Sequence, residues 1–170
     1  MLQESDSLKP NFLDGDSLKL DIQVVSRYEA GSILTSAQRC SEVSFLISIG
    51  APEDDLPDGY LNVSRKLRLL FGDTETPEDG PNESDVQRLI DLAEELSSST
   101  CKVLIHCEAG VSRSTAAALI LYTCLLGPGS EREAMYRVLQ RRPIAHPNRR
   151  MVRIADELLG REGRLIRALG

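Results

Sequence analysis

The sequence predicts an α/β fold, a three-layer sandwich in which a central, mostly parallel sheet of four to five strands carries helices on both faces. Two observations predict this class. Short apolar runs bounded by turn residues, which are typical of buried strands, alternate along the chain with longer segments of helical period. Such strand–helix units favour a parallel sheet, because the return to a parallel neighbour requires a crossover connection.

The strands are predicted from the apolar runs. Residues 43–49 form a mostly apolar run that stops at the turn residues 50–52, as a buried strand does. Residues 103–105 form a second buried run. The segments 21–25 and 67–71 are predicted as two further strands.

The helices are predicted from caps and from apolar spacing. Asn82 is a favourable N-cap, and the residues after it are apolar on one helical face. Residues 114–121 are Ala-rich and apolar all round, as in a buried helix. Ser130 and Glu133 have the spacing of a capping box. Helices are therefore expected at 32–40, 82–96, 114–121 and from 130 onward, with a last helix after a break at 142–148.

Length and periodicity predict one domain. A chain of 170 residues fits a single domain with a sizeable core. Residues 1–18 show no clear period and are expected to be a loose N-terminal arm, whereas 19–170 are expected to form the single domain.

Composition excludes several classes of protein. No stretch approaches the ~20 apolar residues of a membrane span, and the first residues do not have the pattern of a signal peptide. The four cysteines lack paired spacing, which favours buried thiols in a reducing compartment, so a cytoplasmic location is expected. With two histidines and no Cys-x-x-Cys motif, neither a metal site nor a cofactor is expected. The cysteines are Cys40, Cys101, Cys107 and Cys124.

The net charge of −6 is unevenly distributed. Residues 1–130 carry 10 basic and 21 acidic side chains, whereas residues 131–170 carry ten arginines and five acids. Arginines spread along amphipathic helices are typical of a solvated face, although such a segment can also steer anions. The acidic pI of about 5.0 argues against a nucleic-acid partner.

Residues 106–115, HCEAGVSRST, are the segment most informative about function. They place Cys107 and Arg113 in a loop between a predicted strand and a predicted helix. Small residues allow such a loop to curl tightly, so that its N–H groups converge on an anion above the helix N-terminus. The helix end and the guanidinium favour the thiolate form of the cysteine. The small residues are Ala109, Gly110 and Ser112. The segment therefore indicates a nucleophilic thiolate in an oxyanion-binding loop.

This segment resembles the signature H-C-x5-R-S/T of the cysteine-dependent protein tyrosine phosphatases. The short chain is more similar to their compact dual-specificity branch, and the similarity runs from about residue 20 to about residue 160. The resemblance implies the protein tyrosine phosphatase-like fold and hydrolysis of phosphate monoesters without a metal.

The resemblance also implies the roles of the signature residues. Cys107 would be the nucleophile that forms a phosphocysteine, Arg113 would bind two phosphoryl oxygens, and Ser114 would hydrogen-bond the sulfur. His106 would support the loop without transferring protons. The phosphoryl group would be bound by residues 108–113, namely Glu108, Ala109, Gly110, Val111, Ser112 and Arg113.

The reaction also needs a general acid for the leaving oxygen. By resemblance it lies on the loop after the strand 67–71, where Asp73 is the best match. The loop lacks the Trp-Pro-Asp sequence of larger tyrosine phosphatases. Three other acids of this loop compete for the role: Glu75, Glu78 and Asp79.

The segment from Arg142 to Asn148 resembles the R-x-x-x-x-P-N turn of the compact phosphatases. In that family an Asn near this place braces the active-site loop, and Asn148 matches it. His146, within the turn, is expected to be a turn residue and not a catalyst.

The substrate is less well defined by the sequence. The signature loop contains Glu108 and no Lys, which favours a monophosphate such as phosphotyrosine in a protein, with phosphoserine and phosphothreonine as further candidates. A phosphoinositide or another small phosphate ester is an alternative for the same site. Two other classes are open: a sulfur-handling enzyme of the rhodanese or arsenate-reductase kind, and a phosphoprotein-binding domain without turnover. Neither a nucleic acid nor a membrane is expected as a partner, and the oligomeric state is left open.

Overall fold

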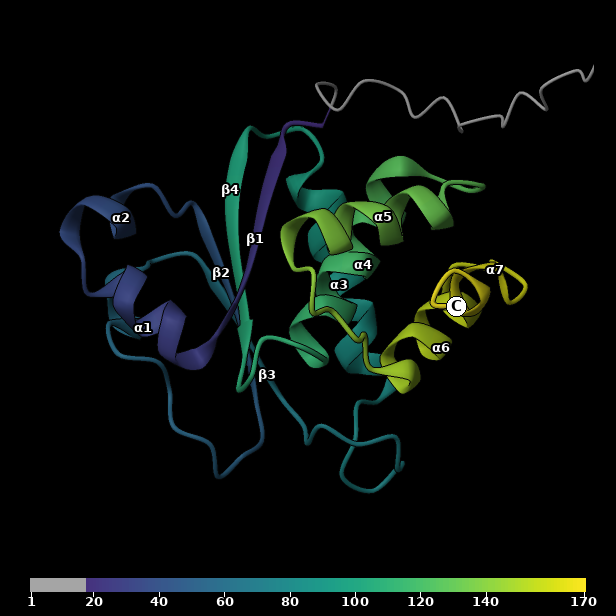
Figure 1. Cartoon of the computed structure of the whole chain (residues 1–170), viewed down its shortest axis with the longest axis horizontal. Coiled ribbons are helices and arrows are strands. Elements are labelled where there is room, and N and C mark those ends of the chain that lie inside the picture. Colours follow the sequence, from purple (N-terminus) through teal and green to yellow (C-terminus); the bar gives the residue numbers. More distant parts are fainter. Residues whose placement is uncertain (1–17) are drawn as a thin grey trace, which may run out of the picture.

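The computed structural model of the chain describes residues 18–170 (Figure 1). The predicted arm at 1–18 lies outside the described residues except for its last residue. The elements in chain order are β1 (Leu20–Ser26), α1 (Arg27–Leu34), α2 (Ala37–Ser41), β2 (Phe45–Gly50), η1 (Tyr60–Asn62), β3 (Lys66–Leu70), α3 (Glu83–Leu96), β4 (Cys101–Cys107), α4 (Arg113–Leu126), α5 (Glu131–Arg141), α6 (Arg149–Leu158) and α7 (Arg164–Arg167).

The sheet has four strands in the order β1-β4-β2-β3, and every neighbouring pair is parallel. The strand β4 therefore lies between β1 and β2, with hydrogen bonds on both edges. Its last residue, Cys107, pairs in register with Ser26 of β1. Residues 106–115 thus begin at the carboxyl end of a central strand, where open α/β sheets bind ligands.

Helices cover both faces of the sheet, which confirms the predicted three-layer α/β class (Figure 1). The helices α1 and α2 lie on one face, over a small core that includes Val25, Leu46 and Leu104. The helices α3, α4, α5 and α6 lie on the other face, over the larger core. Side chains of successive strand residues point to opposite faces, so each strand contributes to both cores.

The two central helices of the larger layer form as predicted. Asn82 caps α3 by accepting a hydrogen bond from the amide of Asp85, whose carboxylate accepts one from the amide of Asn82. An N-cap of this kind contributes about 1 kcal/mol to helix stability. The helix α4 is buried from Arg113 to Thr123, because it packs against the sheet, α3, α5 and α6. This position explains its apolar character on all sides.

The single helix predicted at 32–40 is wrong. The chain instead forms α1 and α2, with a break at Thr35 and Ser36. A capping box starts α1 directly after β1: the Ser26 hydroxyl accepts from the amide of Glu29, whose carboxylate accepts from the amide of Ser26. Ser36 then caps α2.

The capping box predicted at Ser130 and Glu133 is also wrong. The hydroxyl of Ser130 donates backward to the carbonyl of Leu126 and caps nothing. Glu131 is buried beside Arg161, with 2.8 Å between its Oε1 and the Nη1 of the arginine. This buried ion pair lies at the first residue of α5.

No helix within residues 18–170 is both long enough and apolar enough to cross a bilayer. Across the same residues, no three His, Cys, Asp or Glu side chains are grouped so that they could hold a metal ion.

Candidate active site

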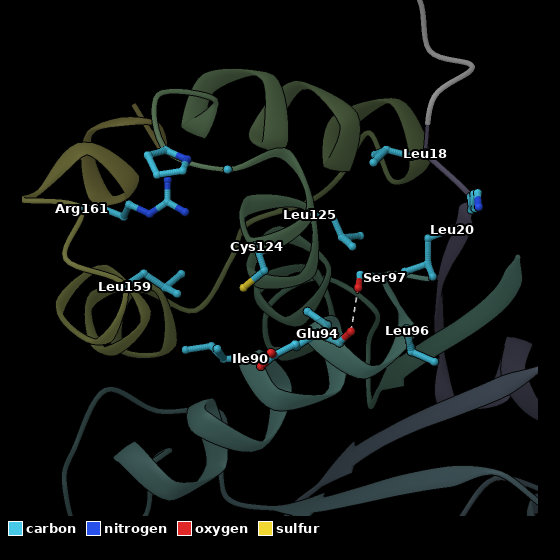
Figure 2. Close-up of a pocket in the computed structure, with 14 residues that line it drawn as sticks. Leu18, Leu20, Ile90, Glu94, Leu96, Ser97, Cys124, Leu125, Leu159 and Arg161 are labelled. Atoms are coloured by element: carbon cyan, nitrogen blue, oxygen red, sulfur yellow. Dashed lines mark hydrogen bonds between the residues drawn. The ribbon is translucent and has the colours of Figure 1, made fainter. Parts of the chain in front are cut away.

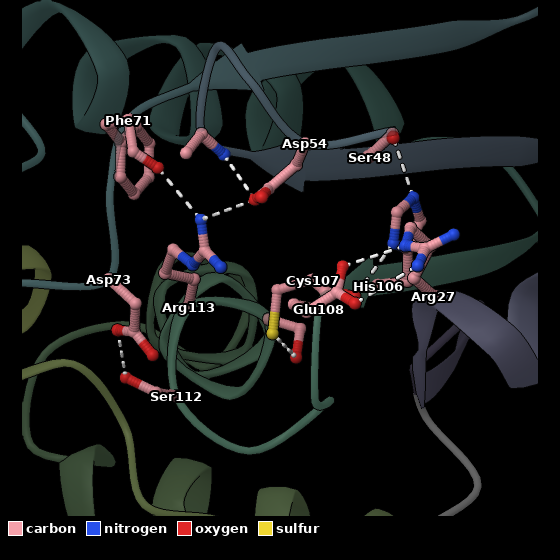
Figure 3. Close-up of polar contacts among 12 residues, drawn as sticks. Arg27, Ser48, Asp54, Phe71, Asp73, His106, Cys107, Glu108, Ser112 and Arg113 are labelled. Carbon is pink, nitrogen blue, oxygen red and sulfur yellow. Dashed lines mark hydrogen bonds and ion pairs between the residues drawn. The ribbon is translucent and has the colours of Figure 1, made fainter. Parts of the chain in front are cut away.

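The candidate nucleophile lies at the end of β4, in the turn that leads to α4. Cys107 is the last residue of the strand and is 2 % exposed. Its Sγ lies 3.1 Å from the Oγ of Ser114, in the first turn of α4 (Figure 3). The hydroxyl can therefore donate a hydrogen bond to a thiolate at this position.

The carbonyls of residues 107–112 all accept hydrogen bonds from the surrounding structure. The donors, in order, are His106 Nδ1 (3.0 Å), Arg27 N (3.0 Å), Arg142 Nη2 (3.4 Å), Arg142 Nε (2.9 Å), His146 N (2.8 Å) and Asn148 N (3.1 Å). In a trans peptide the N–H of the next residue points opposite to the carbonyl. The amides of residues 108–113 are therefore turned toward the inside of the loop, which is the arrangement expected for an oxyanion cradle.

Gly110 makes the tight path of this loop possible. Its φ is +68°, a backbone conformation that residues with a side chain rarely adopt. A Cβ at this position would also lie 2.5 Å from the backbone carbon of Val25 in β1. Both the conformation and the close approach to β1 require glycine here.

Arg113 is buried, with Nη1 anchored and Nε without a hydrogen-bond partner among the described residues. Its Nη1 donates to the carbonyl of Phe71 over 2.9 Å and lies 3.8 Å from a carboxylate oxygen of Asp54 (Figure 3). Its Nε is buried and has no hydrogen-bond partner in the described part of the chain. A guanidinium with an unused donor edge is suited to binding two oxygens of an anion. Asp54, which holds the arginine from the loop after β2, was not among the predicted residues.

The structure places Asp73 beside the signature loop, on the segment that follows β3. Its Oδ1 accepts hydrogen bonds from the Ser112 hydroxyl at 2.6 Å and from the Asn148 side chain at 3.1 Å. Asn148 also joins the loops through its backbone, which donates to the carbonyl of Ser112. No hydrogen bond or ion pair in the described residues joins the side chains of the other candidates to the signature loop; they are Glu75, Glu78 and Asp79.

Glu108 is bound to α1. Its carboxylate forms a bidentate pair with Arg27, with distances of 2.8 and 3.2 Å (Figure 3). The hydrogen bond and charge of Glu108 raise the pKa of Arg27. The predicted substrate-binding role of Glu108 therefore concerns its backbone amide, while its carboxylate fastens the loop to α1.

His106 is buried under the loop with both ring nitrogens engaged. Its Nε2 lies 2.6 Å from the Ser48 hydroxyl of β2, and its Nδ1 faces the carbonyl of Cys107. Burial lowers the pKa of His106 to about 4, so the ring is neutral at pH 7. A neutral, fully hydrogen-bonded ring fits the expected supporting role. His146, in contrast, is exposed and contacts the loop through its backbone amide.

An apolar groove lies elsewhere, on the side of the fold formed by the ends of α3, α4 and α6 (Figure 2). It has a volume of about 510 Å³ and is lined by Leu20, Ile90, Leu96, Cys124, Leu125 and Leu159 among others. Burial raises the pKa of the Cys124 thiol to about 11. None of the residues of the signature loop reaches this groove.

Several of the residues that hold the site were not predicted to do so: Asp54, Arg27, Arg142 and Ser48. Arg142 is the first residue of the R-x-x-x-x-P-N turn, and it donates hydrogen bonds to two carbonyls of the loop. The pattern of this turn could have suggested that role. The other three lie far from residues 106–115 in the sequence and have no local pattern that marks them.

The fold is that of the protein tyrosine phosphatases, as comparison with solved structures shows. Human DUSP28 has a TM-score of 0.64 and 18 % identity, over 88 % of this chain and 95 % of that chain. PTPMT1 in complex with PI(5)P has a TM-score of 0.60 and 14 % identity, over 82 % and 90 % of the two chains. The human tyrosine phosphatase-like serine/threonine/tyrosine-interacting protein has a TM-score of 0.57 and 21 % identity, over 71 % and 78 %.

No protein-family model matches this sequence, and a comparison with curated proteins gives no match. The similarity therefore lies in the fold, and the expected fold is confirmed. The activity must be inferred from the site itself.

Proposed function

We propose that this protein hydrolyses phosphate monoesters through a phosphocysteine intermediate on Cys107. The observation that carries this proposal is the buried and unpartnered Nε of Arg113, at the end of a loop whose amides turn inward beside the Cys107 sulfur. These groups together can bind the three terminal oxygens of a phosphate ester and present a thiolate to its phosphorus.

In the first step, the Cys107 thiolate attacks phosphorus, an S–P bond forms and the bond from phosphorus to the leaving oxygen breaks. Asp73 donates its proton to that oxygen, so the alcohol or phenol leaves neutral. Since Oδ1 of Asp73 already accepts two hydrogen bonds, the proton is carried by Oδ2.

In the second step, water attacks the phosphocysteine. The Asp73 carboxylate accepts a proton from this water, the S–P bond breaks and inorganic phosphate is released. The sulfur leaves as a thiolate, and the Ser114 hydroxyl at 3.1 Å is placed to stabilise its charge.

We infer that the substrate is a phosphorylated protein with a single phosphate in the site. Two loops border the site, 51–59 before η1 and 72–80 before α3, and neither contains Lys or Arg. Such a border disfavours a substrate with several phosphates, such as a polyphosphorylated inositide. The acids of these loops are Glu53, Asp54, Asp55, Asp58, Asp73, Glu75, Glu78 and Asp79.

The experiment that tests this function is hydrolysis of para-nitrophenyl phosphate in EDTA. Wild-type activity and its complete loss in Cys107→Ser are expected, while the matched variant Cys40→Ser retains activity. Inhibition by vanadate is expected in a parallel assay without EDTA, because EDTA chelates vanadate. Asp73→Asn is expected to lower kcat by about 10²–10⁴, and Asp79→Asn to leave it unchanged. Activity in Cys107→Ser would refute the thiolate mechanism, and equal losses in the two Asp variants would refute the choice of acid.

A substrate panel then separates the remaining candidates. Phosphotyrosine, phosphoserine and phosphothreonine peptides are compared with phosphoinositides, thiosulfate and arsenate at equal concentration. Turnover of the peptides is expected. Turnover of thiosulfate or arsenate alone would indicate a sulfur-handling enzyme, and peptide binding without turnover would indicate a binding domain.

A further inference from the structure

The polar contacts under Cys107 continue across the sheet to a residue that the proposed reaction does not use. Arg68 of β3 donates from Nη1 to the hydroxyl of Ser48 in β2 over 2.7 Å, and this hydroxyl lies 2.6 Å from Nε2 of His106 in β4. Ser48 pairs in register with Arg68 on one side and with His106 on the other. The three side chains therefore form one row across three neighbouring strands.

The backbone beside this row leaves room for the guanidinium. A Cβ at Gly50, the last residue of β2, would lie 2.7 Å from Nη2 of Arg68. The arginine thus runs across the surface of β2 toward Ser48 at a point where the strand has no side chain. Ser48 and His106 are almost completely buried, at 0 and 1 % exposure.

The chemistry of the row fixes the direction of each hydrogen bond. A guanidinium can only donate, so the Ser48 oxygen accepts from Arg68 and its single proton is available for Nε2 of the neutral His106 ring. At the other end, the carbonyl of Cys107 can only accept, so Nδ1 carries the ring proton. The Cys107 carbonyl therefore requires the neutral tautomer with the proton on Nδ1, and the Ser48 proton stabilises that tautomer by binding to Nε2.

This tautomer bears directly on the cradle. The bond from Nδ1 holds the carbonyl of Cys107 toward His106 at 3.0 Å, which turns the amide of Glu108 to the opposite side of the peptide plane. That amide is the first donor of the loop, next to the sulfur. A ring that rotated or changed tautomer would release this peptide.

We propose that Arg68 is a positioning residue for Cys107: acting through Ser48, it holds His106 neutral with its proton on Nδ1. This inference rests on the proposed function of Cys107 as the nucleophile. Arg68 acts in two ways, since its bond orients the Ser48 proton and its positive charge opposes a second proton on the ring.

The charges around the row are balanced in favour of this state. Arg27 adds to the positive field at His106, whereas Glu108 opposes it. Burial lowers the pKa of Arg68, as does the neighbouring Arg113, whereas the carboxylate of Asp54 favours its charged form.

The test is the tautomer of His106 by ¹⁵N-resolved imidazole spectra, together with kcat/KM for para-nitrophenyl phosphate. The chain has two histidines, so a His146→Gln variant assigns the signals. Arg68→Met keeps most of the aliphatic side chain and removes both the donor and the charge, and Arg65→Met is the matched control for one lost charge on an exposed arginine. Arg68→Lys restores a donor and the charge, and Ser48→Ala interrupts the row at its centre.

The wild type is expected to show a single neutral tautomer with Nδ1–H from pH 8 to pH 5. In Arg68→Met and Ser48→Ala, mixed tautomers and a fall of about tenfold in kcat/KM are expected, about the worth of one hydrogen bond. Arg68→Lys is expected to recover most of the Nδ1–H tautomer and most of kcat/KM, and Arg65→Met is expected to match the wild type in both.

A folded Arg68→Met or Ser48→Ala variant with the wild-type tautomer would overturn the inference, whatever its activity. Mixed tautomers with unchanged kcat/KM would also overturn it, because Arg68 would then have no effect on Cys107. A wild type without phosphatase activity, whose Arg68→Met and Ser48→Ala variants still show mixed tautomers, would refute the proposed function while the effect of Arg68 on His106 would stand.

Discussion

At the residue scale, the contact between the Cys107 sulfur and the Ser114 hydroxyl acts on the second half of the proposed reaction. The hydroxyl contributes little to the rate at which the thiolate attacks phosphorus. It stabilises the negative charge that returns to the sulfur when the S–P bond breaks. Its loss should therefore slow hydrolysis of the intermediate more than its formation.

Ser114→Ala is expected to lower kcat for para-nitrophenyl phosphate by about tenfold, the usual worth of a hydrogen bond to a charged group. A burst of nitrophenol equal to the enzyme concentration should precede the slow steady state, because phosphocysteine accumulates. Rapid-mixing absorbance measures the burst. A tenfold loss of kcat without a burst would show that Ser114 acts on the first step instead.

His106 makes the stability of the fold depend on pH. Burial lowers its pKa to about 4, compared with 6.5 for the free side chain. Between these two values the unfolded chain binds the proton and the folded chain does not, so acid favours unfolding there. The contribution of His106 is fully present above pH 6.5 and is lost as the pH falls toward 4.

From pH 7.5 to pH 4.5, this histidine is expected to remove about 2–3 kcal/mol from the free energy of unfolding. Urea unfolding at both pH values measures it, with His106→Gln as the reference that cannot titrate. The wild type should lose more stability than the variant over this interval. Equal losses in the two proteins would contradict the burial of a neutral ring.

At the scale of elements, the N-terminus of α6 connects the two loops of the site. Asn148 caps this helix by accepting from the amide of Met151, while its side-chain nitrogen donates to Asp73 and to the carbonyl of Thr74. The helix start thus holds the loop of Asp73, the proposed general acid, against the signature loop.

Asn148→Ala is expected to reduce kcat for phenyl phosphate, which has a poor leaving group, by about tenfold or more, and to affect para-nitrophenyl phosphate less. The matched control is Asn82→Ala, which removes the same kind of cap from α3. Both variants should lose about 1 kcal/mol of stability, but only Asn148→Ala should depend on the leaving group. The same dependence in both would mean that helix fraying, and not the acid loop, is the cause.

Two Ser-x-x-Glu patterns in the chain have different outcomes, and only the one that does not form a capping box was predicted from the sequence. Ser26 and Glu29 have the same spacing as Ser130 and Glu133, and only the first pair forms the box. In the second pair, the Ser130 hydroxyl donates to the carbonyl of Leu126, and the Glu133 carboxylate pairs with Arg137 at 2.7 Å. The spacing of a capping box therefore predicts the box only where neither side chain has another partner.

The same distinction applies to the site. Cys107, Arg113 and Ser114 lie within eight residues, so one motif could predict them together. Asp54 and Arg68 reach the site only through the register of the parallel sheet and the path of a loop. Their neighbours in the sequence give no periodic signal, and only the assembled sheet brings them beside residues 106–115.

At the scale of the whole molecule, the uneven charge is arranged around the site. Most arginines of residues 131–170 are exposed, as expected of a solvated face. Two of them instead fasten the loops of the site: Arg142 binds the carbonyls of Ala109 and Gly110, and Arg150 binds the carbonyl of Pro81. The border that remains for a substrate is formed largely by the acidic loops 51–59 and 72–80.

This border is expected to favour phosphopeptides with Lys or Arg beside the phosphorylated residue. At low ionic strength their kcat/KM should exceed that of acidic peptides by about tenfold, and the difference should shrink in 1 M salt. The difference in kcat/KM between basic and acidic peptides should be smaller in Glu53→Lys and in Glu75→Lys. It should be unchanged in Glu94→Lys, which alters the exposed surface of α3. An unchanged preference in the first two variants would show that the border does not select the substrate.

The carbonyls of this loop are anchored by three separate parts of the chain, which has a consequence for ligand recognition. The conformational entropy of the loop is already lost when the protein folds, since His106 of β4, Arg27 of α1 and the 142–148 turn hold it in place. An oxyanion that enters meets donors that need no rearrangement, so it should bind in a single diffusive step. Under the proposed function, the rigidity of this loop therefore contributes to its affinity for an oxyanion.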